Sequence, residues 1–253
     1  MTSTSSSSAN AGSAALPLFY REPLALNSEA HSGWRLTDGD TGFAAETPYV
    51  PIVLGEIAEA SRCYPIVFAG DTPLPVVVLG LSDGENLFVD ERAWANDHYV
   101  PAYVRRYPFG FVSIPNSDRF ALALDTASER LIREGDAGAP LFENGEPSPL
   151  TRQALQFCEA YQAEFQATQA FMAALNQYGL LTDKRADATL PDGRQYALDG
   201  FKIVDPERFA ALDETVIVDW HRKGWLALVN LHLASLGRLT ALMGRQARRS
   251  SSL

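Results

Sequence analysis

The chain has 253 residues, of which 46% are hydrophobic and 21% are charged. This balance is ordinary for a globular protein and excludes wholesale disorder, a collagen-like repeat and a polytopic membrane protein. Acidic residues outnumber basic ones by 31 to 21, which gives a formal net charge of -10 at pH 7. Because a nucleic-acid-binding surface needs clustered positive charge, we expect no nucleic-acid partner.

The N-terminal segment, residues 1–16, is rich in Ser, and we expect a disordered tail because it cannot bury enough apolar surface to offset chain entropy. It differs from an export signal because it lacks a basic first part, and its apolar stretch is short and contains Pro17. Cys63 and Cys158 are the only cysteines and form no CxxC motif, which favours two buried thiols in a reducing compartment. We therefore expect a cytoplasmic protein.

Residues 17–145 predict a β-rich α+β region. Asn27 can cap a helical turn that runs through His31, and residues 50–63 predict a helix with Pro51 in its first turn. Short apolar runs bounded by turn residues predict the strands of a mostly antiparallel sheet. These runs lie at residues 65–69, 76–81, 86–90, 109–114 and 120–124.

The composition changes at residues 144–149, NGEPSP, where we place the hinge between the two halves. Residues 150–178 contain no Gly or Pro, and Gly179 is well placed to end a helix. Within this segment, a seam at alternating spacings of four and three residues predicts one long helix. The seam consists of Ala154, Cys158, Tyr161, Phe165, Thr168, Met172 and Leu175.

We expect residues 149–249 to form a helical region. It contains a predicted β-hairpin near residues 188–204. Pro191-Asp192-Gly193 marks its turn, and residues 195–204 are its second strand. Asp205 is placed to open a short helix, and residues 212–243 predict a helix that breaks near Gly224. The fold class is therefore α+β, with a β-rich N-terminal half and a helical C-terminal half.

The four histidines do not predict a metal site. His221 and His232 lie eleven residues apart, or about 16 Å along a continuous helix, which is too far for both to bind one metal. A histidine hydrogen-bonded in a packed interface is the simpler interpretation. An enzyme of unknown class that uses His31 or His221 with a carboxylate such as Asp219 stays an alternative.

Motifs for covalent or nucleotide chemistry do not occur in the sequence. Ser82 lies in Gly80-Leu81-Ser82-Asp83-Gly84, which resembles a nucleophile elbow but is typical of a hairpin loop. No GxGxxG or Walker motif is present, so we expect no cofactor.

The segment from Asp97 to Phe109 concentrates aromatic and basic residues. Its tyrosines recur every four residues and would share one face of a helix, with two arginines beside them. Guanidinium groups stack on rings and bind carboxylates, so the segment predicts an anion- or peptide-binding corner. The alternative is that the tyrosines seal the sheet while the arginines pair with acids elsewhere. We expect at least one of Arg105 and Arg106 to contact a carboxylate or backbone carbonyl, and the other to be available to a ligand.

Residues 225–243 are apolar enough to raise the question of membrane insertion. Asn230, His232 and Arg238 interrupt the run and are costly in lipid. We therefore expect a soluble protein without integral membrane insertion, in which this helix is buried or forms a protein interface. A homodimer through the helical half is one such interface.

Several segments carry a resemblance to one family. They lie at residues 19–21, 26–31, 64–68, 79–81, 84–89, 99–109, 200–205, 221 and 231–239. Together they cover roughly residues 17–243, and the run YVPAYVRRYPF at 99–109 is the most specific. On these residues the chain resembles the SapC family, named after a gene linked to bacterial surface-layer proteins.

The resemblance implies no established activity and no catalytic residues. It implies a role in surface-layer or cell-envelope biology, and family members are also labelled as peptide-transport components, which gives a further alternative. Together with the aromatic–arginine segment, it predicts a non-catalytic binding or accessory protein with a protein or peptide partner. The candidate ligand-binding residues are Tyr99, Tyr103, Arg105, Arg106, Tyr107, His31, His221 and His232.

Overall fold

A computed structural model of the protein describes residues 16–70, 72–114, 117, 119–190 and 193–251. The predicted Ser-rich tail lies outside these residues apart from Leu16, and so do Pro191 and Asp192 of the predicted hairpin turn. Antiparallel sheets lie mainly in the N-terminal half and helices in the C-terminal half, which confirms the α+β fold class.

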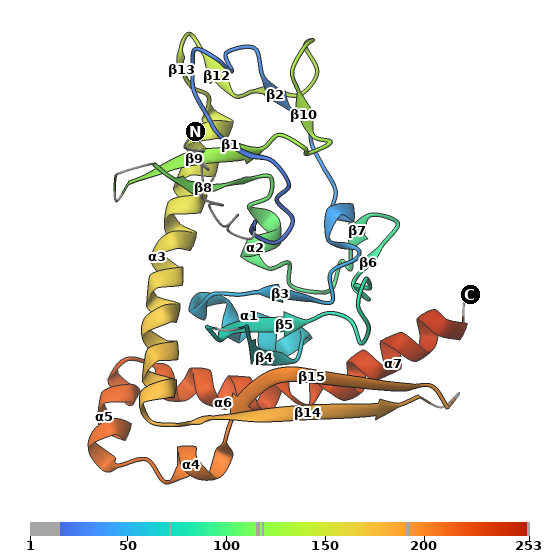
Figure 1. The fold of residues 1–253 in the computed structure, drawn as a ribbon, viewed down its shortest axis with the longest axis vertical. Helices are drawn as coiled ribbons and strands as arrows, with labels where there is room; N and C mark the ends of the chain where they lie inside the picture. Colours follow the sequence, from blue (N-terminus) through green and yellow to red (C-terminus); the bar gives the residue numbers. More distant parts are fainter. Residues whose placement is uncertain (1–15, 71, 115–116, 118, 191–192, 252–253) are drawn as a thin grey trace, which may run out of the picture.

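The upper part of the molecule contains a three-stranded antiparallel sheet (Figure 1). Its strands are, in spatial order, β1 (Pro23–Ala25), β9 (Phe120–Asp125) and β8 (Phe109–Ser113). Shorter strands belong to the same part of the molecule: β2 (Arg35–Leu36), β10 (Leu131–Ile132), β11 (Ala139–Pro140), β12 (Phe142–Glu143) and β13 (Glu146–Pro147). A small apolar core of this part includes Leu124, Leu141 and Cys158.

The lower part contains a five-stranded antiparallel sheet that joins both halves of the chain. Its spatial order is β14 (Leu181–Thr189), β15 (Gln195–Val204), β4 (Ile66–Ala69), β5 (Leu74–Val78) and β3 (Tyr49–Pro51). The predicted strands at 65–69 and 195–204 are confirmed, and the first strand of the hairpin begins at Leu181, earlier than predicted.

The helix predicted at residues 50–63 is shorter than expected. Tyr49–Pro51 is an edge strand that pairs with Val76–Val78 of β5, and a 3-10 turn, η2 (Leu54–Glu56), leads into α1 (Ile57–Cys63). Proline is tolerated on an edge strand because its missing N–H costs no ladder hydrogen bond there. The first residues of this apolar run are thus determined by pairing with a distant strand rather than by local helix signals.

A single long helix, α3 (Pro149–Gln177), connects the upper and lower parts (Figure 1). Its 29 residues give a length of about 44 Å, and Gly179 follows in a left-handed conformation with φ of 62°. The predicted seam faces inward: Tyr161, Met172 and Leu175 are buried, whereas Phe165 is only half-buried. The long helix and its end are confirmed.

The predicted hinge at 144–149 coincides with the turn of a β-hairpin and the start of α3. Asn144 and Gly145 both have positive φ and form the turn between β12 and β13. An Asn-Gly pair is the preferred sequence for such a turn. The chain then enters α3 at Pro149, capped by the hydroxyl of Ser148.

The C-terminal helices are α4 (Pro206–Ala210), α5 (Glu214–Arg222), α6 (Trp225–Ser235) and α7 (Arg238–Ser251). Asp205 caps α4 and a left-handed Gly224 separates α5 from α6, as predicted. A second break, at Leu236 and Gly237, divides the apolar run into α6 and α7. The segment Trp225–Arg249 has the length and composition of a membrane span, and 22% of its most apolar window is buried, which is weak evidence for such a span.

The remaining short elements are η1 (Gly42–Ala44), β6 (Val89–Asp90), β7 (Ala93–Trp94) and α2 (Ala102–Arg105). They lie between the upper and lower sheets in Figure 1. This junction brings together segments that are distant in the sequence, and it contains the candidate site.

Candidate functional site

The aromatic–arginine segment at 99–109 lies at this junction, but it does not form the single helical face that was predicted. Only Ala102–Arg105 is helical, so the three tyrosines point to three different parts of the chain. Their hydroxyls donate separate hydrogen bonds: Tyr99 to Glu56 at 2.9 Å, Tyr103 to the carbonyl of Leu18 at 3.1 Å, and Tyr107 to Asp125 at 2.9 Å. The segment therefore connects the two parts of the molecule.

Glu56, a buried carboxylate, fixes the start of α2. Its Oε1 accepts hydrogen bonds from the backbone N–H of Ala102 at 2.6 Å and from the Tyr99 hydroxyl, and its Oε2 accepts one from Val53 at 2.9 Å. Burial raises the pKa of Glu56, and these three hydrogen bonds and the nearby Arg105 oppose the rise. Glu56 thus holds the aromatic–arginine segment against the beginning of α1.

The two arginines of the segment have different surroundings. Arg105 is exposed, and its guanidinium donates to the carbonyl of Val100 at 3.0 Å and to the Tyr99 hydroxyl at 3.1 Å, which confirms the predicted carbonyl contact. Arg106 is enclosed by the rings of Tyr103, Tyr161 and Tyr20, at 4.1, 4.4 and 5.7 Å from its guanidinium carbon. Its buried Nε has no hydrogen-bond partner among the described residues. Cation–π attraction to desolvated rings stabilises a charge in such a position.

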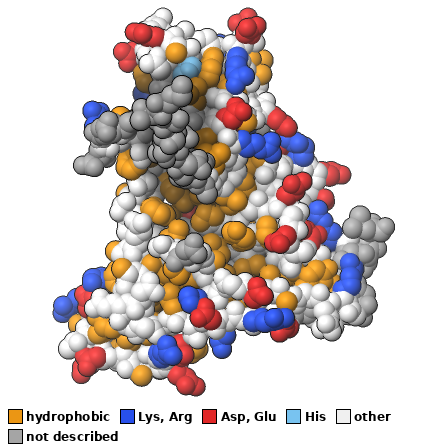
Figure 2. All heavy atoms as spheres, viewed as in Figure 1, with side chains coloured by type: hydrophobic (Ala, Val, Ile, Leu, Met, Phe, Trp, Pro, Cys, Tyr) orange, Lys and Arg blue, Asp and Glu red, His pale blue; other side chains and the backbone are white. Residues whose placement is uncertain are grey.

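Next to this cluster the structure has a cavity of about 660 Å³. Tyr107 is the one residue of the eight predicted ligand-binding residues that lines it. Phe19, Tyr20 and Phe43 also line the cavity, and the four rings contact one another, with centroids of Phe43 and Tyr107 4.2 Å apart. Figure 2 shows hydrophobic side chains gathered in the middle of this face of the molecule, with acidic and basic side chains along its right-hand edge.

Buried contacts hold the aromatic wall of the cavity in place. The Asp125 carboxylate is fully buried and accepts hydrogen bonds from the Tyr107 hydroxyl and from the backbone N–H groups of Arg21 and Glu22. Burial, followed by the bond to Asp125, raises the pKa of Tyr107 to about 12, so its hydroxyl stays protonated at neutral pH. The Tyr20 hydroxyl donates to a backbone carbonyl of β8.

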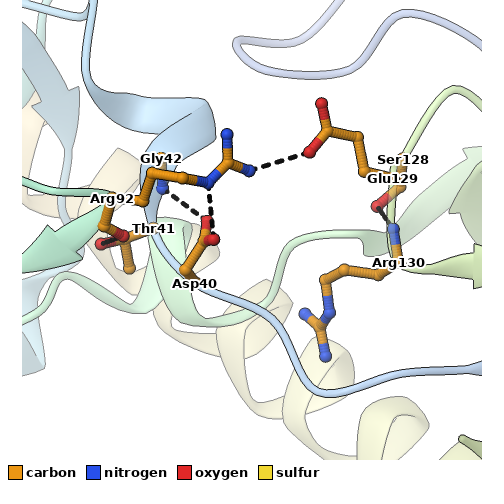
Figure 3. A network of polar contacts seen from close by, with 7 residues as sticks. All are labelled: Asp40, Thr41, Gly42, Arg92, Ser128, Glu129 and Arg130. Atoms are coloured by element: carbon orange, nitrogen blue, oxygen red, sulfur yellow. Dashed lines mark hydrogen bonds and ion pairs between the residues drawn. The ribbon is translucent and has the colours of Figure 1, made fainter.

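Charged side chains line the rim of the same cavity. The guanidinium of Arg92 bridges Asp40 at 2.7 Å and Glu129 at 2.8 Å (Figure 3). Hydrogen bonding to Arg92 lowers the pKa of Asp40, and the backbone N–H of Gly42 donates to the same carboxylate. This bridge connects three loops that are far apart in the sequence.

Arg130 differs from Arg92 because it forms no ion pair with a described residue. Its Nε donates to the carbonyl of Thr37 and one Nη to the carbonyl of Tyr107, both at 3.1 Å. In Figure 3 its guanidinium lies apart from the Asp40–Arg92–Glu129 bridge. Burial lowers the pKa of Arg130, and the nearby Asp38, Tyr107 and Asp40 oppose this shift.

Backbone conformation around the cavity is unusual in two places. Phe19 has φ of 76° and Arg92 has φ of 66°, in the left-handed region that costs a non-glycine residue about 1–2 kcal/mol. Glu91 and Arg92 form the two-residue turn between β6 and β7. Gly39 also has a packing role, because a Cβ there would lie 2.3 Å from Cδ of Arg130. Phe19 lies in a turn closed by the hydrogen bond from the Tyr20 N–H to the Pro17 carbonyl, so both left-handed positions belong to turns.

The three predicted histidines lie on different elements, and none of them lines the cavity. His31 is buried and stacks on Trp34, and its Nδ1 accepts a hydrogen bond from the backbone of Asn27, which caps the predicted turn. Burial lowers the pKa of His31. His221 is exposed on α5, where its side chain has no bond to a carboxylate among the described residues. The structure therefore does not bring the proposed histidine–carboxylate pair together.

His232 is almost completely buried between β15 and β4. Its Nε2 accepts a hydrogen bond from the N–H of Val204 at 3.1 Å, and its Nδ1 lies 3.0 Å from the carbonyl oxygen of Ile66. These two strands pair only at Phe201 and Lys202, so the imidazole bridges them where the ladder ends. Burial lowers the pKa of His232 to about 4, which keeps the ring neutral.

A second cavity of about 540 Å³ lies on the five-stranded sheet and is lined by valines and by the chain around Phe201. It contains none of the eight predicted residues. Among the described residues, no group of three or more His, Cys, Asp or Glu side chains has the arrangement of a metal site.

The sequence did not predict the residues that surround the first cavity apart from Tyr107. Asp40, Arg92, Arg130 and Glu129 come from separate loops, and no local spacing relates them. One signal was available: the loop TDGDTG at 37–42 has two glycines beside two carboxylates, a composition typical of a turn that approaches other side chains closely.

Comparison with known proteins agrees with the family suggested by the aromatic–arginine segment. The SapC family model matches residues 26–242, which include this segment, Asp40, Arg92, Arg130 and the whole of α3. Residues 19–21, which carry part of the cavity wall, lie before the matched range. No curated protein and no solved structure matches the chain. Since the match covers most of the 253 residues, the chain belongs to the SapC family.

Proposed function

We propose that this SapC-family chain is a non-catalytic binding or accessory protein of surface-layer or cell-envelope biology, and that it binds a peptide or a peptide segment of a partner protein. The observation that carries the proposal is the cavity at the junction, where four contacting rings lie beneath a rim of paired and unpaired charges. A typical small-molecule site has a mostly apolar lining, whereas this lining combines an aromatic wall with arginines and carboxylates, which favours a ligand that is partly apolar and partly polar, as a peptide is.

The size and position of the cavity support a peptide rather than a large flat partner surface. Its volume of about 660 Å³ lies within the range of small-ligand sites, which is roughly 300–1,000 Å³. The aromatic wall suits an apolar side chain, because rings bury a large area at low entropic cost. The rim, with guanidinium and carboxylate groups, suits the polar backbone ends or charged side chains of a peptide.

The proposal is tested by filling the cavity. Ala127 lines it and is half-buried, so Ala127→Trp should occupy the space of a ligand. Ala163 lies on the solvent face of α3 and Ala163→Trp is the matched control. Tagged wild type and both variants are used to recover partners from cell extract, which are identified by mass spectrometry and then tested as purified components.

We expect wild type and Ala163→Trp to bind the same purified partner, and Ala127→Trp to lose it while its melting temperature stays close to that of wild type. Equal binding by all three proteins would exclude the cavity as the partner site. Size-exclusion chromatography with light scattering on the same samples tests the homodimer through the helical half.

The cytoplasmic location and the lack of membrane insertion belong to the same proposal. The lack of membrane insertion is supported by the contacts of His232 and Ser235 on α6, which hydrogen-bond to the backbone of β4 and would be lost if α6 left the sheet. Cell fractionation tests both. Recovery of the wild-type chain in the carbonate-resistant membrane fraction would contradict them.

A further inference from the structure

The charges on the cavity rim divide into those that are paired and those that are not. Arg92 is neutralised by two carboxylates, Asp40 and Glu129. By contrast, Arg130 forms no ion pair with a described residue, although it is half-buried. Asp38 and Asp40 act on Arg130 electrostatically without forming an ion pair with it, so an anion that enters the cavity can still form a charge-assisted hydrogen bond with this partly desolvated guanidinium.

Two backbone contacts fix the orientation of Arg130. Its Nε and one Nη donate to the carbonyls of Thr37 and Tyr107, at 3.1 Å each, so the plane of the guanidinium is held from one side. The other Nη donates to no acceptor among the described residues. Gly39 lies against the stem of the arginine, where a Cβ would clash with Cδ at 2.3 Å. The group is therefore preorganised, with donors left for a ligand.

The balance of charge selects the kind of anion. The lining contains three arginines and four carboxylates, so its net charge disfavours an anion with two charges more strongly than an anion with one charge. A carboxylate has one charge and matches the planar donor fork of a guanidinium. Next to Arg130 lies the ring of Tyr107, which contacts Phe43 and Phe19.

We propose that Arg130 binds the free α-carboxylate of a ligand whose apolar side chain lies on the rings of Phe19, Phe43 and Tyr107. The shared chemistry is an α-carboxylate beside an apolar side chain, which a free amino acid and the C-terminus of a peptide both supply. This inference rests on the proposed function, because it names the part of the peptide that the same cavity recognises.

The test uses isothermal titration calorimetry on the full chain with four probes. They are the tripeptide Ala-Ala-Phe as the free acid, the same tripeptide as the C-terminal amide, phenylalanine and phenyl phosphate. The acid and the amide differ only in the charge at the proposed contact. A charge-assisted hydrogen bond contributes about 1.5–3 kcal/mol, so we expect the amide to bind roughly 10- to 150-fold more weakly than the acid.

Substitution of Arg130 tests whether this residue contacts the carboxylate of the ligand. Arg130→Gln should weaken binding of the acid by a similar factor and leave binding of the amide unchanged, whereas Arg62→Gln, on the exposed surface of α1, should change neither. Circular dichroism and the melting temperature establish whether Arg130→Gln is folded. If that variant does not fold, the comparison of acid and amide on the wild-type chain decides alone.

The outcomes are distinct. Tighter binding of the tripeptide acid than of phenylalanine supports a peptide C-terminus, and equal or tighter binding of phenylalanine supports a free amino acid. Equal affinity for acid and amide, tighter binding of phenyl phosphate, or no binding of any probe at millimolar concentration would overturn the carboxylate inference. If the Ala127→Trp variant nevertheless loses its partner, the proposed function stands and only the ligand class is wrong.

Discussion

The buried imidazole of His232 makes the stability of this protein dependent on pH, and the size of the effect follows from the structure. The ring connects β15 to β4 through Val204 and Ile66, and burial lowers its pKa to about 4. In the unfolded chain the pKa of histidine is about 6.5. As the pH falls, the unfolded state therefore binds a proton before the folded state does.

The direction and size of the change in stability follow from this difference in pKa between the folded and unfolded states. The stabilisation is fully present above a pH of about 6.5 and is lost progressively as the pH falls toward about 4. Between about pH 7 and about pH 5, the expected loss in the free energy of unfolding is about 2 kcal/mol from His232 alone. His31, whose pKa burial also lowers, contributes in the same direction.

The assay is urea unfolding of wild type and His232→Gln at both pH values, followed by circular dichroism. Glutamine keeps polar atoms near the strands but does not titrate, so the variant should be less stable at neutral pH and lose about 2 kcal/mol less than wild type on acidification. His221→Gln, on the exposed face of α5, is the control and should behave as wild type. The loss in the free energy of unfolding between the two pH values is compared for wild type and His232→Gln. If the two losses agree within about 0.5 kcal/mol, His232 does not cause the effect.

Three further predictions concern packing and backbone strain, each measured as a change in the free energy of unfolding. Phe171→Ala should cost about 3–5 kcal/mol, because the ring is 1% exposed and packs against two tryptophans; a loss below about 1 kcal/mol would contradict the packing. Glu91→Gly should stabilise the chain by about 1 kcal/mol, since the exposed residue has φ of 44°; destabilisation would show that the turn is not strained. Arg106→Lys should cost about 1–2 kcal/mol through lost stacking on three rings; wild-type stability together with loss of a ligand would instead make Arg106 a binding residue.

The elements that the sequence predicted well are those with local signals. The long helix α3 follows from its periodic seam, and the helix ends at Gly179, Asp205 and Gly224 follow from caps and left-handed glycines. These features depend on residues within one or two turns of each other, so no knowledge of the tertiary structure is needed. The Asn144-Gly145 hairpin had an equally local signal that we interpreted as a hinge.

The features that the sequence did not predict depend on contacts between distant segments. Tyr49–Pro51 is a strand because Val76–Val78 pairs with it, although the apolar run that begins there also fits a helix. The same limit applies to the charges around the cavity. Arg92 meets Asp40 and Glu129 across 52 and 37 residues of sequence, and no spacing rule relates positions so far apart.

The geometry of residues 105–107 explains how one short segment can support the fold and also contribute to the cavity. Arg105 faces solvent, Arg106 faces the three tyrosines at the junction, and Tyr107 faces the cavity. Successive residues at the end of a helix point about 100° apart, so adjacent positions serve different surroundings. Glu56 holds the start of the helix and Asp125 holds Tyr107 beyond its end. Because the segment is fixed on both sides, we expect its backbone to move little when a ligand binds, as in other preorganised sites.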